Sequence, residues 1–467
     1  MSKTKNSATR MNIVSYITTL AGVAAVLVMI HWILVDWWYG FFLIHPTLTI
    51  GIWVFYGILW AYSAYLAIRT VLAIRKKPLG SAALKKTQRV PGLLMLVGVI
   101  ATIGVLYGPT MGEINTTPHL SFTGDPATSI TVTWYSTTPY TGQVLYGTNP
   151  SSLISSANET TTTKEHVITL ADLIPGTRYY YQVGQFGSTW SFKTASNQTN
   201  NVTFATFADV HSIFYEPMIP GITVVNPDFI IAAGDLADFG GWQSDWQRFF
   251  QQMSPFATNF SLMTAVGNHD SMTPAGGPNY DRYLSMPTSS SGTERYYYFT
   301  YNGVHFICLD LEWGIETYSA AQRSWLEGLL DTIPTTDWLV VYDHCMFYSS
   351  GSFGNATGDL SKLYNTAGDA IGTFHDLFVS HDVDLVISGH DHHFEITNAD
   401  NVVYAIVGTA SLRLDSRSPA NNTQSIYYET ELPGFTEIEI LGSTCTISGR
   451  LYQNDVPMAP FVYSFAQ

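Results

Sequence analysis

Long apolar stretches dominate the first quarter of the 467-residue chain. They run over Asn12–Val35, Thr47–Ile68 and Pro91–Gly108. A helix needs about 20 apolar residues to cross the roughly 30 Å hydrocarbon core of a bilayer. The first two stretches reach that length, and the third is short but uncharged. A cleaved signal peptide would explain the first stretch alone, but two more follow and no small-residue cleavage site is evident. The pattern predicts a membrane anchor of three transmembrane helices in residues 1–112.

Short alternations of apolar and polar residues replace these stretches between residues 117 and 195. Ser129–Tyr135 and Gly142–Tyr146 alternate as strands do, and Asn149-Pro150 marks a turn. Six or seven such strands in this length predict a β-sandwich. The stretch Leu173–Tyr179, with the sequence LIPGTRY, is similar to the fibronectin type III pattern, in which the tyrosine packs against the preceding turn.

From Val202 to the end of the chain, apolar runs end in polar clusters and alternate with helix-like stretches such as Ser319–Thr332 and Asp369–Ser380. The runs are Val202–Ala208, Phe229–Ala233, Leu262–Val266, Val304–Leu309, Leu339–Tyr342 and Leu385–Ile387. Apolar strands separated by helices predict a buried sheet in a layered α/β domain over residues 202–467. Ligands of such sheets bind at the carboxyl ends of the strands.

The charges give the expected orientation of the anchor. Basic residues precede the first apolar stretch and separate the second from the third, and the aromatic link after Asp36 has none. Positive segments stay in the cytoplasm, so we expect a multi-pass cell-membrane protein with a cytoplasmic N-terminus and an extracellular catalytic domain. The partner of residues 1–112 would be the lipid bilayer.

The rest of the chain is strongly acidic. Beyond Gly112 it carries 35 acidic and 11 basic residues, a formal net charge of −24. Such a domain repels phosphate backbones, so we expect no nucleic-acid binding. Most of these acids have their simplest explanation in a solvated surface.

Five clusters of His, Asp and Asn follow five of the apolar runs. They are Asp209-Val210-His211, Gly234-Asp235, Gly267-Asn268-His269-Asp270, His344 and Gly389-His390-Asp391-His392. One such cluster occurs by chance in many proteins, whereas five in series predict a shared site. Carboxylate, imidazole and amide donors suit Zn, Mn or Fe. In an extended segment residues i and i+2 point the same way, which would let Asp209 and His211 meet at one ion.

These motifs resemble those of the calcineurin-like metallophosphoesterases, a four-layer α/β sandwich, and the preceding β domain resembles that of purple acid phosphatases. The resemblance implies two metal ions, a first held by Asp209, His211, Asp235 and His392 and a second by Asp235, Asn268, His344 and His390. It implies that His269 contacts the phosphate and donates a proton, and that Asp270 orients His269 by accepting its other ring proton.

The chain departs from purple acid phosphatases at two positions. They have glycine where His211 stands, and a ligand tyrosine where this chain has Asp238. Without that tyrosinate we expect a colourless protein with no obligatory ferric ion. Tyr348, His393 and Arg413 belong to no motif but are weaker candidates to line the pocket.

The leading hypothesis is therefore a membrane-anchored, acid phosphatase-like hydrolase of phosphate monoesters or diesters. Its two metal ions would activate a bridging water as hydroxide. The alternative is a catalytically inactive cell-surface binding or adhesion protein that retains the fold.

Overall fold

The structure is a computed structural model that describes residues 113–184, 186–196, 200–272, 276–312, 318–351, 374–415, 422 and 424–467. These residues lie within one compact unit, Pro109–Gln467. The three membrane helices expected from the sequence fall in residues 1–112, outside the described residues. Among the residues that are described, none of the helices combines the length and apolar character needed to span a bilayer.

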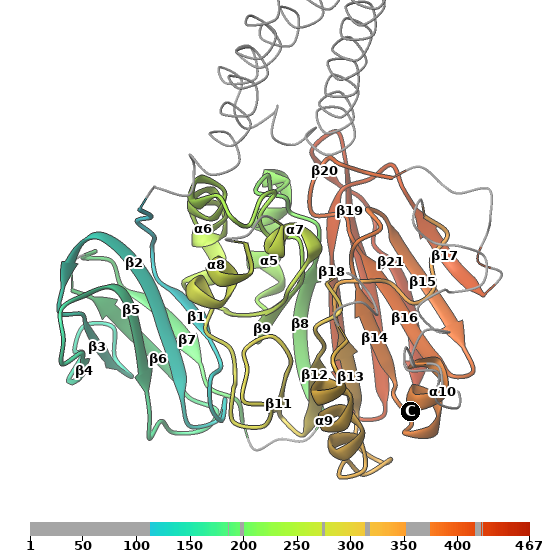
Figure 1. The fold of residues 1–467 in the computed structure, drawn as a ribbon, viewed down its shortest axis with the longest axis horizontal. Helices are drawn as coiled ribbons and strands as arrows, with labels where there is room; N and C mark the ends of the chain where they lie inside the picture. The colour runs from blue at the N-terminus through green and yellow to red at the C-terminus, as the bar shows by residue number, and fades with distance from the viewer. Residues whose placement is uncertain are drawn as a thin grey trace, which may run out of the picture. The chain divides into compact units, whose positions relative to one another are not determined.

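The N-terminal part of this unit is a β domain of seven strands in two sheets (Figure 1). The strands are β1 (His119–Ser121), β2 (Ile130–Tyr140), β3 (Gln143–Gly147), β4 (Ser155–Asn158), β5 (Thr163–Leu170), β6 (Arg178–Val183) and β7 (Trp190–Lys193). The hydroxyl of Tyr179 accepts a hydrogen bond of 3.0 Å from the amide of Ile174, so this tyrosine packs on the turn before it, as expected. The likeness to fibronectin type III domains stays a prediction.

Two large sheets form the rest of the unit. In the first, the parallel strands β8 (Asn201–Phe207), β9 (Phe229–Ala233) and β10 (Ser261–Ala265) lie side by side. In the second, β13 (Leu339–Tyr342) and β14 (Leu385–Ser388) are parallel neighbours. Every polar cluster of the sequence follows one of these five strands, so strand order brings the clusters to one edge.

The β domain is continuous with the first of these sheets. Strand β1 pairs in parallel with β10 through Leu120 and Ser261, and the hydroxyl of Tyr181 donates to the carbonyl of Thr258 at 2.8 Å. The whole sheet has the order β20-β19-β18-β8-β9-β10-β1-β2-β5, with β21 beside β19. The β domain therefore extends the first large sheet, a continuity that the expected domains over residues 117–195 and 202–467 did not include.

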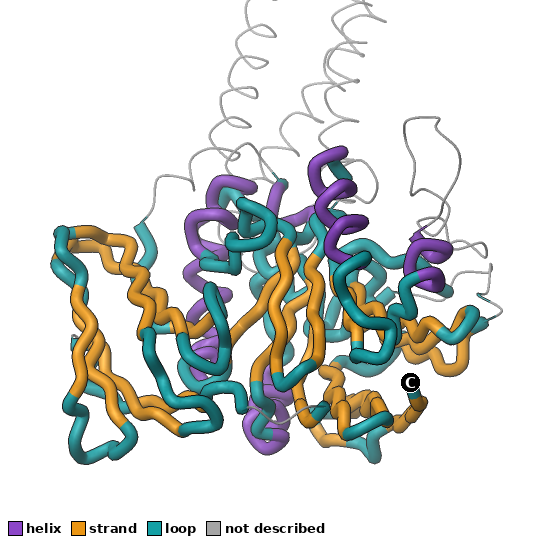
Figure 2. Tube along the Cα trace, turned by 90° about the horizontal axis from the view of Figure 1, so that it is seen from below, coloured by secondary structure: helices purple, strands orange, loops and turns teal. Residues whose placement is uncertain are grey.

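Side-chain alternation along the strands packs the two large sheets against each other and leaves an outer face for helices. On β12 (Val304–Cys308), Phe306 faces the other sheet and packs on Phe204 and Phe229, with ring centroids 5.5 and 5.2 Å apart. Its neighbour Ile307 belongs instead to the apolar cluster beneath two helices, because successive side chains point to opposite faces of a strand. Figure 2 shows the helices around the strands.

The helices of the outer layers follow the expected pattern in part. Leu326 and Leu330 of α9 (Ala320–Leu330) and Phe378 of α10 (Phe374–Ser380) pack in the cluster that contains Ile307. The residues expected to begin the second of these helices, 369–373, lie outside the described residues. The other helical segments are η3 (Glu216–Met218), α5 (Ile219–Val225), α6 (Gln243–Ala257), α7 (Asn268–Ser271) and α8 (Gly276–Tyr283).

Strands β9 and β13 occupy the residues predicted from the sequence, and β8 and β10 are displaced by one residue. The strands toward the C-terminus were not predicted individually. The remaining strands of the two sheets are β11 (Tyr297–Tyr301), β15 (Phe394–Ala399), β16 (Val402–Val407), β17 (Ser425–Glu429), β18 (Gly434–Leu441), β19 (Thr444–Gln453), β20 (Val456–Pro457) and β21 (Phe461–Ala466).

Candidate dinuclear metal centre

The polar residues after the strands lie on sharply turned backbone. Asp209, His211, Asp235 and His390 have φ angles of 61°, 48°, 53° and 71°. Residues other than glycine rarely adopt such angles, and they do so most often at functional sites. The expected extended conformation of the Asp209-Val210-His211 segment is therefore wrong: the side chains of Asp209 and His211 converge through left-handed turns and not through strand alternation.

Two glycines allow these turns to come close together. A Cβ atom on Gly267 would lie 2.1 Å from the amide nitrogen of Asp235. One on Gly234, where φ is +86°, would lie 2.4 Å from Nδ1 of His344. No other residue type fits at either position without moving a candidate ligand.

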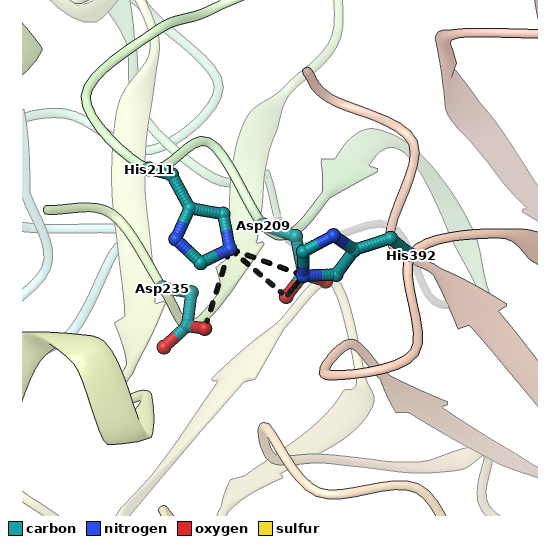
Figure 3. Close-up of side chains that lie close together, drawn as sticks. All are labelled: Asp209, His211, Asp235 and His392. Carbon is teal, nitrogen blue, oxygen red and sulfur yellow. Dashed lines mark hydrogen bonds and ion pairs between the residues drawn. The ribbon is translucent and has the colours of Figure 1, made fainter. Parts of the chain in front are cut away.

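Four side chains converge in a first cluster, Asp209, His211, Asp235 and His392 (Figure 3). Nε2 of His211 lies 3.1 Å from Nε2 of His392 and 3.5 Å from Oδ2 of Asp235. Nε2 of His392 lies 3.4 Å from Oδ1 of Asp209. Donor atoms about 2.0–2.2 Å from a common cation are separated by about 3–3.5 Å, so this spacing fits one ion.

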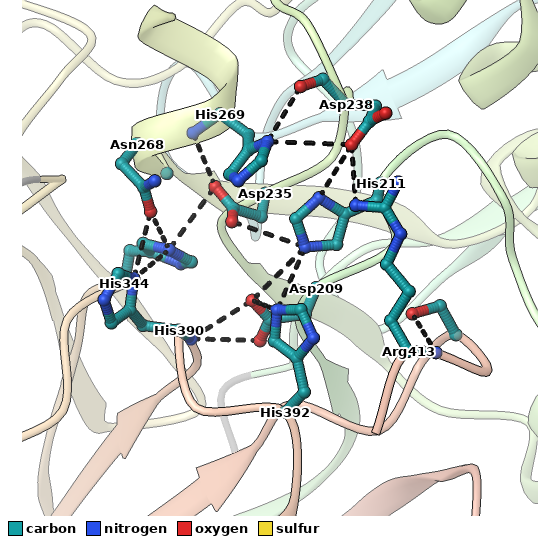
Figure 4. Close-up of polar contacts among 12 residues, drawn as sticks. Asp209, His211, Asp235, Asp238, Asn268, His269, His344, His390, His392 and Arg413 are labelled. Carbon is teal, nitrogen blue, oxygen red and sulfur yellow. Dashed lines mark hydrogen bonds and ion pairs between the residues drawn. The ribbon is translucent and has the colours of Figure 1, made fainter. Parts of the chain in front are cut away.

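A second cluster lies beside the first and contains an amide in place of one carboxylate (Figure 4). Oδ1 of Asn268 is 3.0 Å from Nε2 of His344 and 3.0 Å from Nδ1 of His390. Nε2 of His344 lies 3.3 Å from Oδ1 of Asp235. Asp235 thus presents one oxygen to each cluster, which is the geometry of a ligand that bridges two ions.

Hydrogen bonds orient several of these groups. The ring of His344 lies with Nδ1 3.0 Å from the carbonyl oxygen of Ala233. A proton on Nδ1 leaves the Nε2 lone pair directed into the cluster. The amide of His390 donates to both oxygens of Asp209, at 3.2 and 3.0 Å.

Burial and neighbouring charge move the pKa values of the histidines in opposite directions. Burial lowers the pKa of His390 to about 3. Burial also opposes the charged forms of His344 and His392, but Asp235 and Asp209 outweigh it and raise the pKa to about 10 for His344 and about 9 for His392. Without a metal ion, protons therefore balance part of the carboxylate charge.

His269 is partly open to solvent, with 19% of its side chain exposed. It was expected to bond to Asp270, and this expectation is wrong: Nδ1 of His269 lies 2.8 Å from the carbonyl oxygen of Asp238. Asp270 instead accepts hydrogen bonds from the amides of Ala237 and Gly267, at 2.8 and 2.9 Å. Its carboxylate therefore fixes the turns around Asp235 and does not orient the imidazole.

Asp238 and Arg413 lie behind the first cluster and support it, and the sequence motifs did not identify this pair. Oδ1 of Asp238 accepts from Nη1 of Arg413 at 2.7 Å and lies 3.3 Å from Nδ1 of His211. Burial would raise the pKa of Asp238, but Arg413 outweighs it and lowers this pKa to about 2. The sequence did contain one indication of this pair: residues 211 and 238 both depart from the purple acid phosphatase pattern.

Two weaker candidates lie away from the clusters. His393 is fully buried, with Nε2 3.0 Å from Oε2 of Glu395. The ring of Tyr348 packs on Tyr404, with centroids 4.8 Å apart. Both side chains therefore belong to the support of the neighbouring strands.

Family models match two successive parts of the chain. Residues 202–394 match the calcineurin-like phosphoesterase family, and residues 116–199 match the purple acid phosphatase N-terminal domain. Both domains were anticipated from the motifs, and this part of the expectation is confirmed.

Whole-protein relatives agree with these matches. Purple acid phosphatase 18 of Arabidopsis thaliana is 28% identical over 302 residues, which cover 61% of this chain and 66% of the relative. Acid phosphatase type 7 of Homo sapiens is 24% identical over 316 residues, 59% of this chain and 69% of the relative. In two further Arabidopsis purple acid phosphatases the match spans only 53% of the relative's length. These homologues support a metal-dependent phosphatase.

The fold has a counterpart among solved structures. A purple acid phosphatase from yellow lupin (Lupinus luteus) seeds superimposes with a TM-score of 0.61 at 18% identity, covering 76% of this chain and 74% of that protein. At this identity the likeness concerns the fold alone. It confirms an α/β metallophosphoesterase fold behind an N-terminal β domain.

Metal binding should depend on pH, because each ion must displace a proton from one histidine with a raised pKa. We expect the affinity for Zn²⁺ or Mn²⁺ to rise about tenfold per pH unit per ion between pH 6 and 8, with loss of metal in acid. Isothermal titration in buffers of different ionisation enthalpy measures both affinity and proton release. A pH-independent affinity would contradict this assignment of the ligands.

Proposed function

We propose that this chain, which carries a calcineurin-like phosphoesterase domain behind a purple acid phosphatase N-terminal domain, hydrolyses phosphate monoesters or diesters at two divalent metal ions. The observation that carries the proposal is the position of Asp235, with one carboxylate oxygen toward each of two donor clusters. When bound, a metal pair supplies a nucleophile from water near neutral pH and neutralises charge on the phosphoryl oxygens.

The donor sets indicate which residues hold which ion. Asp209, His211, Asp235 and His392 would hold the first, and Asp235, Asn268, His344 and His390 the second. Neither set contains a thiolate or phenolate, and nitrogen and carboxylate donors favour Mn, Zn or ferrous Fe. We therefore propose a colourless centre without an obligatory ferric ion.

His269 is placed to supply a proton to the leaving group. Its Nδ1 is occupied by the carbonyl of Asp238, so Nε2 is the nitrogen free to carry a transferable proton. The carboxylate of Asp238 also lies 3.6 Å from the same Nδ1. The backbone amide of His269 also donates to Oδ1 of Asp235 at 2.8 Å. This bond fixes the position of His269 relative to the proposed bridging ligand.

The alternative, an inactive adhesion protein that retains the fold, would be favoured by a lost ligand. Each residue proposed as a ligand is described in the structure, and each points into one of the two clusters (Figure 4). No observation among the described residues favours that alternative.

The first test replaces Asp235 by Ala in the purified full-length protein, assayed with para-nitrophenyl phosphate and its bis ester in Mn²⁺ or Zn²⁺. Loss of the bridging ligand should lower turnover by more than about 100-fold, the upper end of what loss of a supporting residue costs. Asp331→Asn, an exposed acid on the surface, is the control. Unchanged turnover in Asp235→Ala would eliminate a centre bridged by this residue.

Replacement of His269 by Asn separates proton transfer from metal binding. We expect kcat to fall by about 10²–10⁴-fold while both ions stay bound, because His269 belongs to neither cluster. The loss should shrink for substrates with better leaving groups, which need less protonation. An equal loss for good and poor leaving groups would argue against His269 as the acid.

We also propose that residues 1–112 anchor the chain in a membrane with its catalytic domain outside. The support is the three apolar stretches and the basic residues that flank them. After alkaline carbonate extraction the full chain should stay with the membranes, and protease added to intact cells should cleave the catalytic domain. Protection of that domain in intact cells would contradict the orientation.

A further inference from the structure

The segment Ser411–Asp415, here called the clasp, follows β16 and contacts both sides of the first cluster. The amide of His392 donates to Oδ2 of Asp415 at 2.9 Å, and the amide of Asp415 donates to the carbonyl of His392 at 3.0 Å. Two residues earlier, Arg413 reaches Asp238. The clasp therefore contacts two parts of the site. One is His392, after β14, and the other is Asp238, which lies beside His211 after β8.

The contact with His211 runs through one intermediate carboxylate. Nη1 of Arg413 donates to Oδ1 of Asp238 at 2.7 Å, and the same oxygen lies 3.3 Å from Nδ1 of His211. The other ring nitrogen of His211 faces His392 and Asp235. Nδ1 of His211 is buried and makes no aligned hydrogen bond among the described residues, so the Asp238 carboxylate is the polar group beside it. A carboxylate beside Nδ1 favours a proton on that nitrogen and leaves Nε2 as the metal-binding nitrogen.

We propose that Arg413 and Asp415 are positioning residues of the clasp, which hold His211 and His392 in place as ligands of the first metal ion. The inference rests on the proposed function, since it assigns a role toward an ion of that centre. It adds two residues that no motif of the sequence identified.

Fold stability alone does not explain why Arg413 and Asp238 form a buried ion pair. Only 15% of the Arg413 side chain and 1% of the Asp238 side chain are exposed. Among the described residues, Nη2 of Arg413 and Oδ2 of Asp238 are buried without a hydrogen-bond partner. A buried ion pair that is incompletely satisfied stabilises a fold weakly, and apolar replacements are often neutral.

Two other roles fit the contacts less well. Asp238, His211 and His269 lie close enough to form a third cation site, but the guanidinium of Arg413 already lies against Asp238 and would repel a cation. The two terminal nitrogens of Arg413 are poorly placed for direct phosphate binding, because Nη1 is bonded to Asp238 and Nη2 is buried. The contacts favour orientation of His211.

The clasp should act on one ion and not on the other. It contacts His392 directly and His211 through Asp238, whereas Nδ1 of His344 in the second cluster lies against the carbonyl of Ala233. Loss of the clasp should therefore weaken the first ion selectively, which a general loss of stability would not do.

The test compares Arg413→Met and Asp415→Ala with the wild type in the full-length protein. We expect each variant to bind the first ion about 10–100-fold more weakly and the second ion unchanged. Dialysis against graded chelator followed by metal analysis gives both affinities. Replacing the bound metal by Co²⁺ gives visible absorption bands, and the band that is lost in a variant identifies the ion that is weakened. Arg450→Met, which removes an arginine paired with Glu437 on β18, is the matched control.

Each outcome bears on the proposal. Two ions bound with wild-type affinity in both variants would overturn it, as would equal weakening of both ions. Arg413→Lys should restore part of the affinity, because the charge can still reach Asp238. If Arg413→Met alone does not fold, Arg413→Met/Asp238→Leu removes both charges; we expect it to fold with a weak first site, and normal binding would overturn the role of Arg413. A wild type that binds no metal would instead contradict the proposed function.

Discussion

The Asp235 carboxylate is the point on which the site depends. It lies at the end of β9 on a left-handed residue, it is 2% exposed, and its two oxygens face histidines from the two sheets, His211 and His344. Burial of an ionised carboxylate between two sheets is costly unless positive charge lies beside it. The close approach of Gly267 and Gly234, the support from the amide of His269 and the order of the strands all serve to hold it there.

This constraint links the fold to the charge of the site. In the metal-free chain, protons on His344 and His392 balance Asp235 and Asp209, which is why their pKa values rise despite burial. Two cations would take over that role and release the protons. The ions would therefore take part in the reaction and would also stabilise the contact between the two sheets.

The sequence predicted the strands and the candidate ligands better than the local geometry. Apolar runs ending in His, Asp or Asn were sufficient to predict one shared site, because carboxyl ends of neighbouring strands share an edge. The division of its residues between two ions came from the resemblance to metallophosphoesterases. The backbone at Asp209 and His211 was wrongly predicted to be extended, because only tertiary packing stabilises the positive φ angles found there. The partner of His269 was misassigned to Asp270, and Arg413 was expected only to line the pocket. Both errors concern contacts between residues far apart in the chain, which spacing does not reveal.

The most direct test of a centre bridged by Asp235 is anomalous X-ray diffraction from a crystal of the protein grown with Mn²⁺ or Zn²⁺, with data collected at the metal absorption edge. The account predicts two anomalous peaks on either side of the Asp235 carboxylate, one among Asp209, His211 and His392 and one among Asn268, His344 and His390. A single peak, or two peaks that Asp235 does not join, would contradict it.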